Sequence, residues 1–393
     1  MKVLFVKHSL DWPLSRGHDV YSYYMMKALG RLGHEVYLAT SHGASPEALG
    51  GLDLRAHFHL DDGATPTSDI TLAWLHRRMQ SYYRVVERGL SVLRERIALL
   101  QPDAVIGVAV EGLAYLPAAD GTVRVWYPGD ELALSHFSQC LCRHPAVISN
   151  VRQGAMNALY ERSYARFVDR VWVVSEEERR AMRWVAGIRT VDVLPIGVDT
   201  DVYRPNGGCA RQPTAVFWGR LDAAPNVQAL EWFCDHVWPS LIDREPNARF
   251  TIIGFSPSER VARLGRQLGV EVVPDVPDLS HYVLPRSVAV LPFVSGSGSK
   301  NKLLEAAALG VPIVCTARAA RGLRAPWEAP LIVTDGAASM SDAVAALWTD
   351  TAHCDRLAQA ARQWVIRHHP WESSARVGID AIAESLEQAR NGH

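Results

Sequence analysis

The chain has few cysteines and no long apolar run. Six cysteines are scattered over 393 residues, and only Cys140 and Cys142 lie close together. This usage indicates a cytosolic protein rather than a disulfide framework. No apolar stretch approaches the roughly 18 residues of a membrane span, and the apolar start VLFV is shorter than the roughly 7–15 residues of a signal peptide. We expect a cytoplasmic protein, at most in contact with the inner face of a membrane.

The chain also lacks a charge imbalance and several common motifs. Lys and Arg number 41 against 42 Asp and Glu, so the formal net charge is −1. No DNA- or RNA-reading motif is visible, and we expect no nucleic-acid partner. The Walker loop GxxxxGK[ST] is missing, and GxGxxG does not follow the first predicted strand, which disfavours a dinucleotide dehydrogenase. Because no DxD-type set of ligands occurs in a suitable loop, we expect no metal and no other cofactor.

What the sequence does contain is a regular alternation of short apolar strands and helices. Such alternation predicts βαβ units and parallel sheets. The predicted strands are 2–6, 34–40, 103–110, 123–128 and 170–175, then 215–222, 249–256, 270–274, 288–293 and 312–316.

A segment rich in proline and glycine, VDVLPIGVDTDVYRPNGG, separates the two series of strands and predicts a linker. The length of the chain suits two domains. We therefore predict an α/β protein of two doubly wound, Rossmann-like lobes, residues 1–190 and 191–370. Ligands of such sheets bind at the carboxyl ends of the strands, here in a cleft between the lobes.

Three helical features can be read from the chain. Ser175 with Glu178, and Ser256 with Glu259, predict capping boxes, the second with Pro257 at the first helical position. The segment 71–100 predicts a long arginine-rich helix. Its arginines suit a solvated outer face, or else contact with a membrane surface or an anionic acceptor.

The stretch SGSGSKNKLLEAAALG predicts a small-residue loop followed by a helix that Gly310 ends. A helix N-terminus carries unpaired N–H groups and partial positive charge, so lysines there are unfavourable unless an anion is near. Glycines let the backbone approach a ligand. These features describe a phosphate cradle, in which Lys302 and Glu305 share one helix face. The alternative is a surface ion pair between them, worth about 0.2–0.5 kcal/mol.

At this point the sequence resembles a family. The pieces LPIGVDTDVYRP, FWGRLDAAPNVQALEWF, RFTIIGFSP, VEVVPDVPDL, VAVLPF and SGSGSKNKLLEAAALGVPIVCT, in this order, resemble retaining GT-B nucleotide-sugar glycosyltransferases of family 4. The pattern GxxNKxLEAxAxGxPIV is most similar to that of exopolysaccharide-associated sugar transferases. The first lobe matches more loosely. In this family residues 371–393 would form a closing helix that packs back on the N-terminal lobe.

The resemblance implies roles for particular residues. Arg220 and Lys302 would hold the donor diphosphate, and Glu305 would accept hydrogen bonds from the ribose hydroxyls. The remaining donor-binding positions that the family implies are Gly17, Gly254, Val276, Gly298 and Ser299. Arg220 and Lys302 would also stabilise the leaving diphosphate during catalysis.

The sequence departs from the family pattern in three places. Ser297 stands where the first glutamate of the E-x7-E motif is expected, which leaves the donor sugar open. The lysine that usually follows GRLD is replaced by AAPN. Ile196 stands where the family usually has asparagine, a change that we do not interpret.

Acceptor contacts are expected from the first lobe. Asp130 and Glu131, just after a predicted strand, suit this role, with Asp130 as a catalytic candidate; Glu111 is placed similarly. Acids that simply stabilise a helix N-terminus are the alternative for each. Four residues in HFSQCLCRH, His136 to His144, could bind zinc, but their spacing is not that of common zinc sites.

The resemblance thus implies a retaining glycosyltransferase, which we expect to be metal-independent. Its partners would be a nucleotide-diphosphate sugar and a glycan, lipid-linked or small-molecule acceptor. The alternatives are a sugar-nucleotide epimerase of the same fold and a nucleotide-sugar-binding protein without transfer activity. Loss of the carboxylate at Ser297 favours the last of these, whereas Arg220, Lys302 and Glu305 disfavour it.

Overall fold

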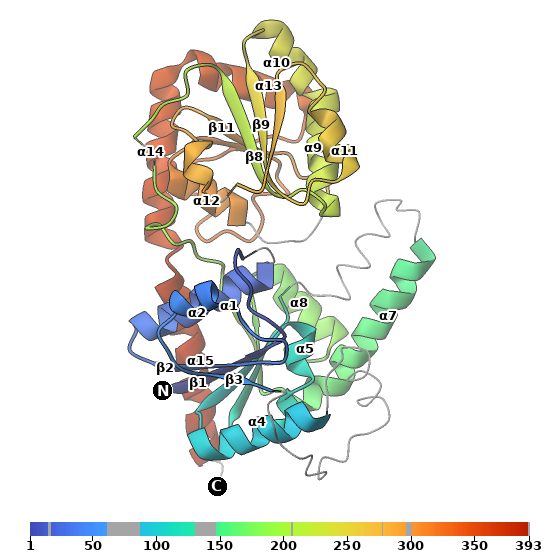
Figure 1. Cartoon of the computed structure of the whole chain (residues 1–393), viewed down its shortest axis with the longest axis vertical. Helices are drawn as coiled ribbons and strands as arrows, with labels where there is room; N and C mark the ends of the chain where they lie inside the picture. The colour runs from blue at the N-terminus through green and yellow to red at the C-terminus, as the bar shows by residue number, and fades with distance from the viewer. Residues whose placement is uncertain are drawn as a thin grey trace. The chain divides into compact units, whose positions relative to one another are not determined.

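A computed structural model of the chain describes residues 1–14, 17–60, 87–129, 147–205, 207–276, 278–295 and 301–391. The chain divides into two compact units (Figure 1): Met1–Pro195 together with Trp371–His393, and Ile196–Pro370. The second unit begins at Ile196 rather than at 191, because Val191–Val193 forms the last strand of the first sheet.

The first unit is built on a parallel sheet, which has seven strands among the described residues, in the order β3-β2-β1-β4-β5-β6-β7. β1 lies between β2 and β4, so the winding reverses there, as in other doubly wound sheets. The strands are β1 (Lys2–Lys7), β2 (Glu35–Thr40), β3 (Leu54–His59), β4 (Ala104–Val108), β5 (Val123–Tyr127), β6 (Arg170–Val173) and β7 (Val191–Val193).

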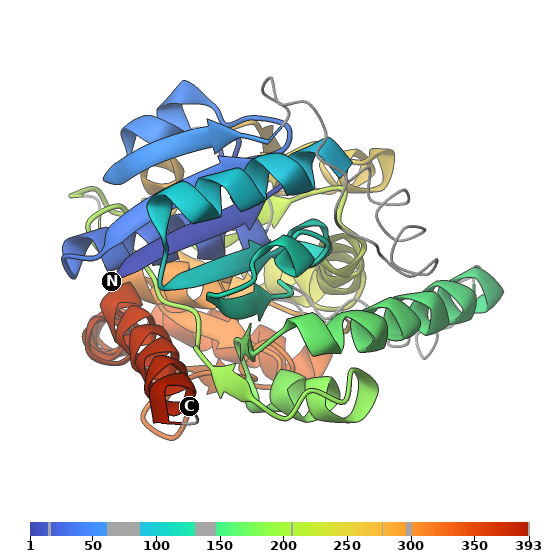
Figure 2. The ribbon, with the colours of Figure 1, turned by 90° about the horizontal axis from the view of Figure 1, so that it is seen from below.

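Helices cover both faces of this sheet, because its strands carry apolar side chains on both sides. Leu4 and Val6 of β1 belong to a buried cluster that also contains Leu93, whereas Tyr127 of β5 stacks on Tyr21 at 3.8 Å between ring centroids. Figure 2 shows α4 lying over the strands and α7 projecting beyond them. The helices are α1 (Gly17–Arg31), α2 (Pro46–Gly50), α4 (Glu87–Leu100), α5 (Ala109–Leu113), α7 (Val147–Tyr164), α8 (Glu176–Val185) and α15 (Trp371–Asn391).

The C-terminal helix α15 belongs to the first unit and packs on α1. Trp371 stacks on Tyr24 at 5.7 Å between ring centroids, and Glu372 pairs with Arg31 at 3.1 Å. Gly378 brings the helix so close to Trp172 of β6 that a Cβ there would lie 2.8 Å from the indole ring. The last 20 or so residues are therefore part of the core of the first unit.

The second unit has a parallel sheet of six strands among its described residues, in the order β10-β9-β8-β11-β12-β13. Figure 1 shows α12 and α14 on one side of this sheet and α9 and α11 on the other. Its elements are β8 (Thr214–Arg220), α9 (Ala224–His236), α10 (Trp238–Arg244), β9 (Arg249–Phe255), α11 (Glu259–Leu264), β10 (Val270–Pro274), β11 (Val288–Leu291), α12 (Asn301–Leu309), β12 (Ile313–Cys315), β13 (Ile332–Val333), α13 (Ala337–Thr349) and α14 (Thr351–His368).

The two predicted capping boxes have different outcomes. The Ser175 hydroxyl accepts from the N–H of Glu178, which confirms the first cap. The second prediction is wrong: α11 begins at Glu259 and its cap is Ser258, whose hydroxyl accepts from the N–H of Val261. Ser256 instead has φ of +53° and takes the chain round a turn, so Pro257 precedes the cap.

Other sequence predictions also meet the structure here. All ten predicted strands form, and Gly310, with φ of +67°, ends α12 as expected. β3, β7 and β13 were not expected. Of the predicted helix 71–100, residues 71–86 lie outside the described residues, and α4 supplies the remainder. None of the helices in the described ranges is long and apolar enough to cross a membrane.

His369 joins three segments within the second unit. Its Nδ1 lies 2.9 Å from the carbonyl oxygen of Ile196 and donates to it, and its Nε2 accepts from the N–H of Arg324 at 3.2 Å. The ring also packs on Trp364, at 4.8 Å between centroids. Burial is the main cause that lowers the pKa of His369 to about 4.

This neutral histidine should make the protein acid-sensitive. Below about pH 6.5, the pKa of an unfolded histidine, His369 binds a proton in the unfolded chain but stays neutral in the folded chain. The free energy of unfolding therefore falls between about pH 6.5 and pH 4. From pH 7 to pH 5 the loss due to His369 is about 2 kcal/mol. Urea unfolding of His369→Gln should show a correspondingly smaller drop over this range, with His353→Gln, in the helix α14 that His369 directly follows, as control. An unchanged pH dependence in His369→Gln would contradict this assignment.

Candidate functional site

The main candidate site lies at the carboxyl edge of the second sheet, around β8 and α12. The order of the strands reverses at β8, which has β9 on one side and β11 on the other. Crevices at such reversals are where open α/β sheets bind their ligands. α12 begins at Asn301 after β11, so its first N–H groups and partial positive charge lie at this edge.

Lys302, in the first turn of α12, has its ammonium group against two aromatic rings. Its Nζ lies 5.7 Å from the ring centroid of Phe217 and 5.6 Å from that of Phe293. Aromatic faces attract cations at these distances. Burial lowers the pKa of Lys302, and the charge of Glu305 acts in the opposite direction. The lysine is therefore a positive charge with reduced hydration, which suits binding of an anion.

Glu305, one turn further along α12, is held by hydrogen bonds. Its Oε2 accepts from the indole Nε1 of Trp218 at 2.6 Å, and the hydroxyl of Tyr203 also hydrogen-bonds to the carboxylate. Burial raises the pKa of Glu305, while the bond from Trp218, the charge of Lys302 and the bond from Tyr203 lower it. The structure thus brings Lys302 and Glu305 together as the sequence indicated, and it gives the carboxylate a fixed orientation.

Two glycines face each other across the ends of β8 and β9. Gly219 pairs with Gly254, and their φ angles are +139° and +156°. A Cβ at Gly219 would overlap Cε of Lys302 and lie 2.8 Å from its Nζ. A Cβ at Gly254 would overlap the carbonyl oxygen of Gly219. Gly219 makes room for the lysine, and Gly254 lets β9 come close to the backbone of Gly219.

Gly254→Ala should therefore lower the stability of the second unit by about 1–3 kcal/mol, because the new methyl group overlaps backbone that cannot rotate away. The thermal unfolding midpoint measures the effect. Gly208→Ala is the matched control, since its Cβ would meet only a methyl group of Leu284 at 3.4 Å, an ordinary contact. Equal midpoints for the two variants would contradict the close packing of Gly254 on Gly219.

Arg220 ends β8, next to Gly219. Its Nε and Nη2 donate to the two carboxylate oxygens of Asp222 at 3.0 and 2.6 Å, which raises the pKa of Arg220 and lowers that of Asp222. Asn226 is not part of this ion pair. Its Nδ2 donates to the carbonyl oxygen of Arg220 at 2.6 Å. A diphosphate bound by this guanidinium would have to share it with Asp222 or displace it.

The other predicted residues are distributed over both units. Val276 is buried just after β10, where the N–H of the preceding Asp275 donates to the carbonyl oxygen of Gly254. Gly17 is exposed at the start of α1 in the first unit, and Glu111 is half-buried in α5. Asp130, Glu131, Gly298 and Ser299, together with His136 to His144, lie outside the described residues. Within the described ranges no group of three or more metal-binding side chains occurs.

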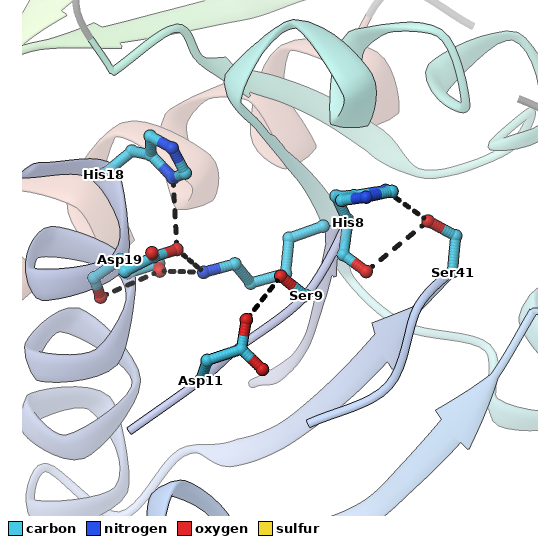
Figure 3. Close-up of polar contacts among 8 residues, drawn as sticks. His8, Ser9, Asp11, His18, Asp19 and Ser41 are labelled. Carbon is cyan, nitrogen blue, oxygen red and sulfur yellow. Dashed lines mark hydrogen bonds and ion pairs between the residues drawn. The ribbon is translucent and has the colours of Figure 1, made fainter. Parts of the chain in front are cut away.

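The carboxyl edge of the first sheet carries a separate polar cluster, drawn in Figure 3. Lys7, at the end of β1, is buried and donates to Oδ1 of Asp19 at 2.6 Å and to the hydroxyl of Ser22 at 3.1 Å. His18 lies 3.2 Å from the same carboxylate oxygen. Burial would raise the pKa of Asp19, but His18 and Lys7 together lower it to about 2. This cluster fixes the first turn of α1.

Two histidines lie beside this cluster. The rings of His8 and His42 are 4.2 Å apart between centroids, and Nδ1 of His8 lies 3.0 Å from the hydroxyl of Ser41. These side chains follow β1 and β2, so they occupy the edge at which we expected acceptor contacts.

Sequence reasoning missed the aromatic surroundings of the site. The sequence favours a core position for Trp218, which its 3% exposure confirms, but it gives no role to the indole N–H or to Phe217, Phe293 and Tyr203. The signal was present in FWGRLD: a tryptophan and a glycine directly precede Arg220 at the carboxyl end of a strand. Only the packing of α12 against β8 shows that this tryptophan reaches Glu305.

Comparisons with known proteins agree with this architecture. A family model described as Glycosyltransferase Family 4 matches residues 15–202, and one described as Glycosyl transferases group 1 matches residues 212–350. No curated protein sequence matched the chain.

Solved structures with the same fold cover nearly the whole chain. Sucrose-phosphate synthase from Thermosynechococcus elongatus is 16% identical with a TM-score of 0.70, covering 99% of this chain and 100% of that chain. HepE from Anabaena, solved in complex with UDP and glucose, is 14% identical with a TM-score of 0.67, covering 98% and 99%. A putative UDP-N-acetylglucosamine 2-epimerase from Listeria monocytogenes is 12% identical with a TM-score of 0.56, covering 98% and 97%.

At these identities the structures show the fold alone. The two family models match consecutive segments of the sequence, residues 15–202 and then 212–350. Together the comparisons show the GT-B fold, with a glycosyltransferase family 4 match over most of the first unit and a glycosyl transferases group 1 match on the second.

Proposed function

We propose that the protein moves a sugar from a nucleotide-diphosphate donor to an acceptor hydroxyl, with retention of configuration and without a metal ion. The observation that carries the proposal is the pair Lys302 and Glu305 at the start of α12, with Gly219 making room for the lysine. A cation for phosphate and a fixed carboxylate for hydroxyl groups, one helical turn apart, match the two polar parts of a nucleotide. HepE, of the same fold, binds UDP and glucose.

The proposed chemistry breaks the bond between the anomeric carbon and the diphosphate oxygen. Negative charge then builds on the leaving diphosphate, and Lys302, Arg220 and the N-terminus of α12 stabilise it. The acceptor hydroxyl attacks from the side of the leaving group, which retains the configuration. The departing phosphate oxygen takes the proton of that hydroxyl, so no side chain is needed as base.

The remaining donor contacts are proposals of the same kind. Glu305 accepts from the ribose hydroxyls, and the backbone near Gly254 and Val276 lies along the edge where the base would bind. Gly17, Gly298 and Ser299 would contribute backbone groups to the phosphates.

For the acceptor side we propose a hydroxyl of a glycan, a lipid-linked sugar or a small molecule. Asp130 is the proposed contact and the proposed catalytic residue of the first unit. A cytoplasmic location, with peripheral contact at the inner face of a membrane when the acceptor is lipid-linked, remains part of this proposal. An exopolysaccharide acceptor would agree with the subgroup that the sequence resembles.

Two other functions are distinguishable from transfer. An epimerase is favoured only by the fold it shares with the Listeria protein. Binding without transfer is favoured by Ser297, which replaces an expected carboxylate.

The test is a product assay with UDP-, GDP-, TDP- and ADP-linked sugars and a panel of acceptors of the three kinds. Transfer predicts release of nucleoside diphosphate that depends on acceptor. Proton NMR should show a new glycosidic bond with the anomeric configuration of the donor. An inverted product would contradict retention, a 2-epimerised sugar nucleotide would reveal an epimerase, and binding with no product would leave a binding protein.

A further inference from the structure

Trp218 occupies a fixed place in the middle of the second sheet. It lies on β8, opposite Ile253 of β9, and its side chain is only 3% exposed. A buried indole on a central strand has little freedom to rotate. Its N–H group, 2.6 Å from Oε2 of Glu305, therefore sets where that carboxylate can lie.

The partner of this indole sets it apart from other tryptophans of the chain. Four described tryptophans donate from their indole nitrogen to backbone carbonyl oxygens, and in such places the bond serves the packing of the fold: Trp126, Trp238, Trp348 and Trp364. Trp218 donates to a carboxylate instead. A hydrogen bond to an ionised group is shorter and about twice as strong as one between neutral groups.

The carboxylate needs this bond because its surroundings oppose its charge. Burial favours the neutral form of Glu305, and the bond from Trp218 is the largest influence in the other direction, ahead of Lys302 and Tyr203. A carboxylate has about four lone-pair sites, and the indole occupies one of them. By holding one oxygen in place, Trp218 helps to fix where the remaining lone pairs of the Glu305 carboxylate point.

We propose that Trp218 is a positioning residue for the donor, whose indole N–H orients Glu305 to accept from the pair of hydroxyls on a ribose. The proposal rests on the proposed function, since it concerns the same site. It adds a specificity: the site should distinguish ribonucleotides from 2′-deoxyribonucleotides, and Trp218 should be responsible for part of that difference.

The experiment compares Trp218→Phe with Trp238→Phe by isothermal titration with the ribonucleotides UDP, GDP and ADP and with the deoxyribonucleotides TDP, 2′-deoxy-UDP and 2′-deoxy-GDP. Trp238 is the matched control because it is equally buried in the same unit and donates to the carbonyl oxygen of Leu268. We expect Trp218→Phe to weaken ribonucleotide binding about tenfold, the usual effect of losing a bond to a charged group. Trp238→Phe should bind as the wild type does.

Two readouts separate positioning from a general loss of structure. The Kd for the 2′-deoxyribonucleotide divided by the Kd for the matching ribonucleotide should fall towards one in Trp218→Phe, and it should stay at the wild-type value in Trp238→Phe. The pH below which binding is lost should also rise in this variant, because the carboxylate has lost a donor while Lys302 and Tyr203, the other groups that act on it, are retained.

Each outcome decides the proposal. If wild type binds a ribonucleotide and Trp218→Phe keeps its affinity and its deoxy ratio, the proposal is overturned while the proposed function stands. If wild type binds none of the nucleotides, both fall. Should Trp218→Phe not fold, benzothienylalanine at position 218 replaces the indole N–H by sulfur with the same ring shape, and the same changes must then appear.

Discussion

Replacing Lys302 with alanine is expected to lower kcat/KM for the nucleotide-sugar donor by about 30- to 1,000-fold, a loss of ~2–4 kcal/mol. Glu305→Ala is expected to show a loss of the same size. Each variant removes a group that would make charge-assisted hydrogen bonds in a site partly shielded from water.

The physical reason differs for the two residues. The ammonium group of Lys302 lies over the neighbouring rings of Phe217 and Phe293, so it has given up part of its hydration before any ligand arrives. Its attraction to a diphosphate is strong for that reason, and it grows as charge builds on the leaving group. Glu305 acts on binding instead, because ribose hydroxyls carry the same charge throughout the reaction. Lys302→Ala should therefore lower kcat, and Glu305→Ala should mainly raise KM.

Steady-state kinetics with the donor identified in the product assay measure both effects. Lys27→Ala and Glu231→Ala are controls of the same residue types. Lys27 contacts the ring of Tyr24 on α1, and Glu231 of α9 pairs with Arg260 of α11, so neither is part of the site. If Lys302→Ala and Glu305→Ala both keep the kcat/KM of the wild type, α12 has no part in the reaction.

The second large effect is expected in the first unit, where Lys7→Met should lower the free energy of unfolding by about 3–5 kcal/mol. The side chains of Lys7 and Asp19 are only 2% and 11% exposed and form an ion pair at 2.6 Å. Removing the cation leaves a buried carboxylate without its main counter-charge, and that is the costly event.

A pH dependence accompanies this loss. The pKa of Asp19 is about 2 in the folded wild type and about 3.8 as a free side chain, so its contribution is present above about pH 4 and is lost as the pH falls towards 2. In Lys7→Met the pKa of Asp19 should rise, because Lys7 no longer favours the ionised form. The variant should then lose less stability on acidification than the wild type does.

Urea unfolding at pH 7 tests the first statement, and a comparison of about pH 4 with about pH 3, within the range in which Asp19 titrates, tests the second. Lys2→Met, on the same strand, is the control, since the Lys2 ammonium group makes only an exposed bond to the carbonyl oxygen of Leu100. The double variant Lys7→Met with Asp19→Asn should recover much of the loss, because no unpaired charge remains. If the free energy of unfolding of Lys7→Met lies within about 0.5 kcal/mol of the wild-type value, the ion pair of Lys7 with Asp19 is not needed for stability.

Much of the fold follows from the sequence because parallel strands are short apolar runs bounded by turn residues. KVLFV and VAVLPF could be recognised in this way. β7 could not, because Val191–Val193 lies in a stretch with two prolines and several glycines, and pairing with β6 makes it a strand. β3, LRAHFH, carries polar residues and is only partly buried, so its apolar signal is weak. The cap at Ser258 was missed because Ser256 has Glu259 three residues on and so fits the capping-box rule, whereas Ser258 is followed at that position by Val261.

The site was predictable where it depends on spacing along one helix. Lys302 and Glu305 are three residues apart, so a shared face follows from helix geometry alone. The roles of Trp218, Gly219 and Gly254 depend on how β8, β9 and α12 meet, which are contacts between segments far apart in the chain. The pair of Arg220 with Asp222 is local, but nothing in GRLD distinguishes a free arginine from a paired one.

The most direct measurement is the thermal shift of the wild type and of Glu305→Ala with UDP, GDP, TDP and ADP. If α12 holds a nucleotide diphosphate, one of these nucleotides raises the unfolding midpoint of the wild type, and the rise disappears in the variant. A midpoint that none of the four nucleotides changes, or a rise that survives in Glu305→Ala, would contradict a nucleotide site at this helix.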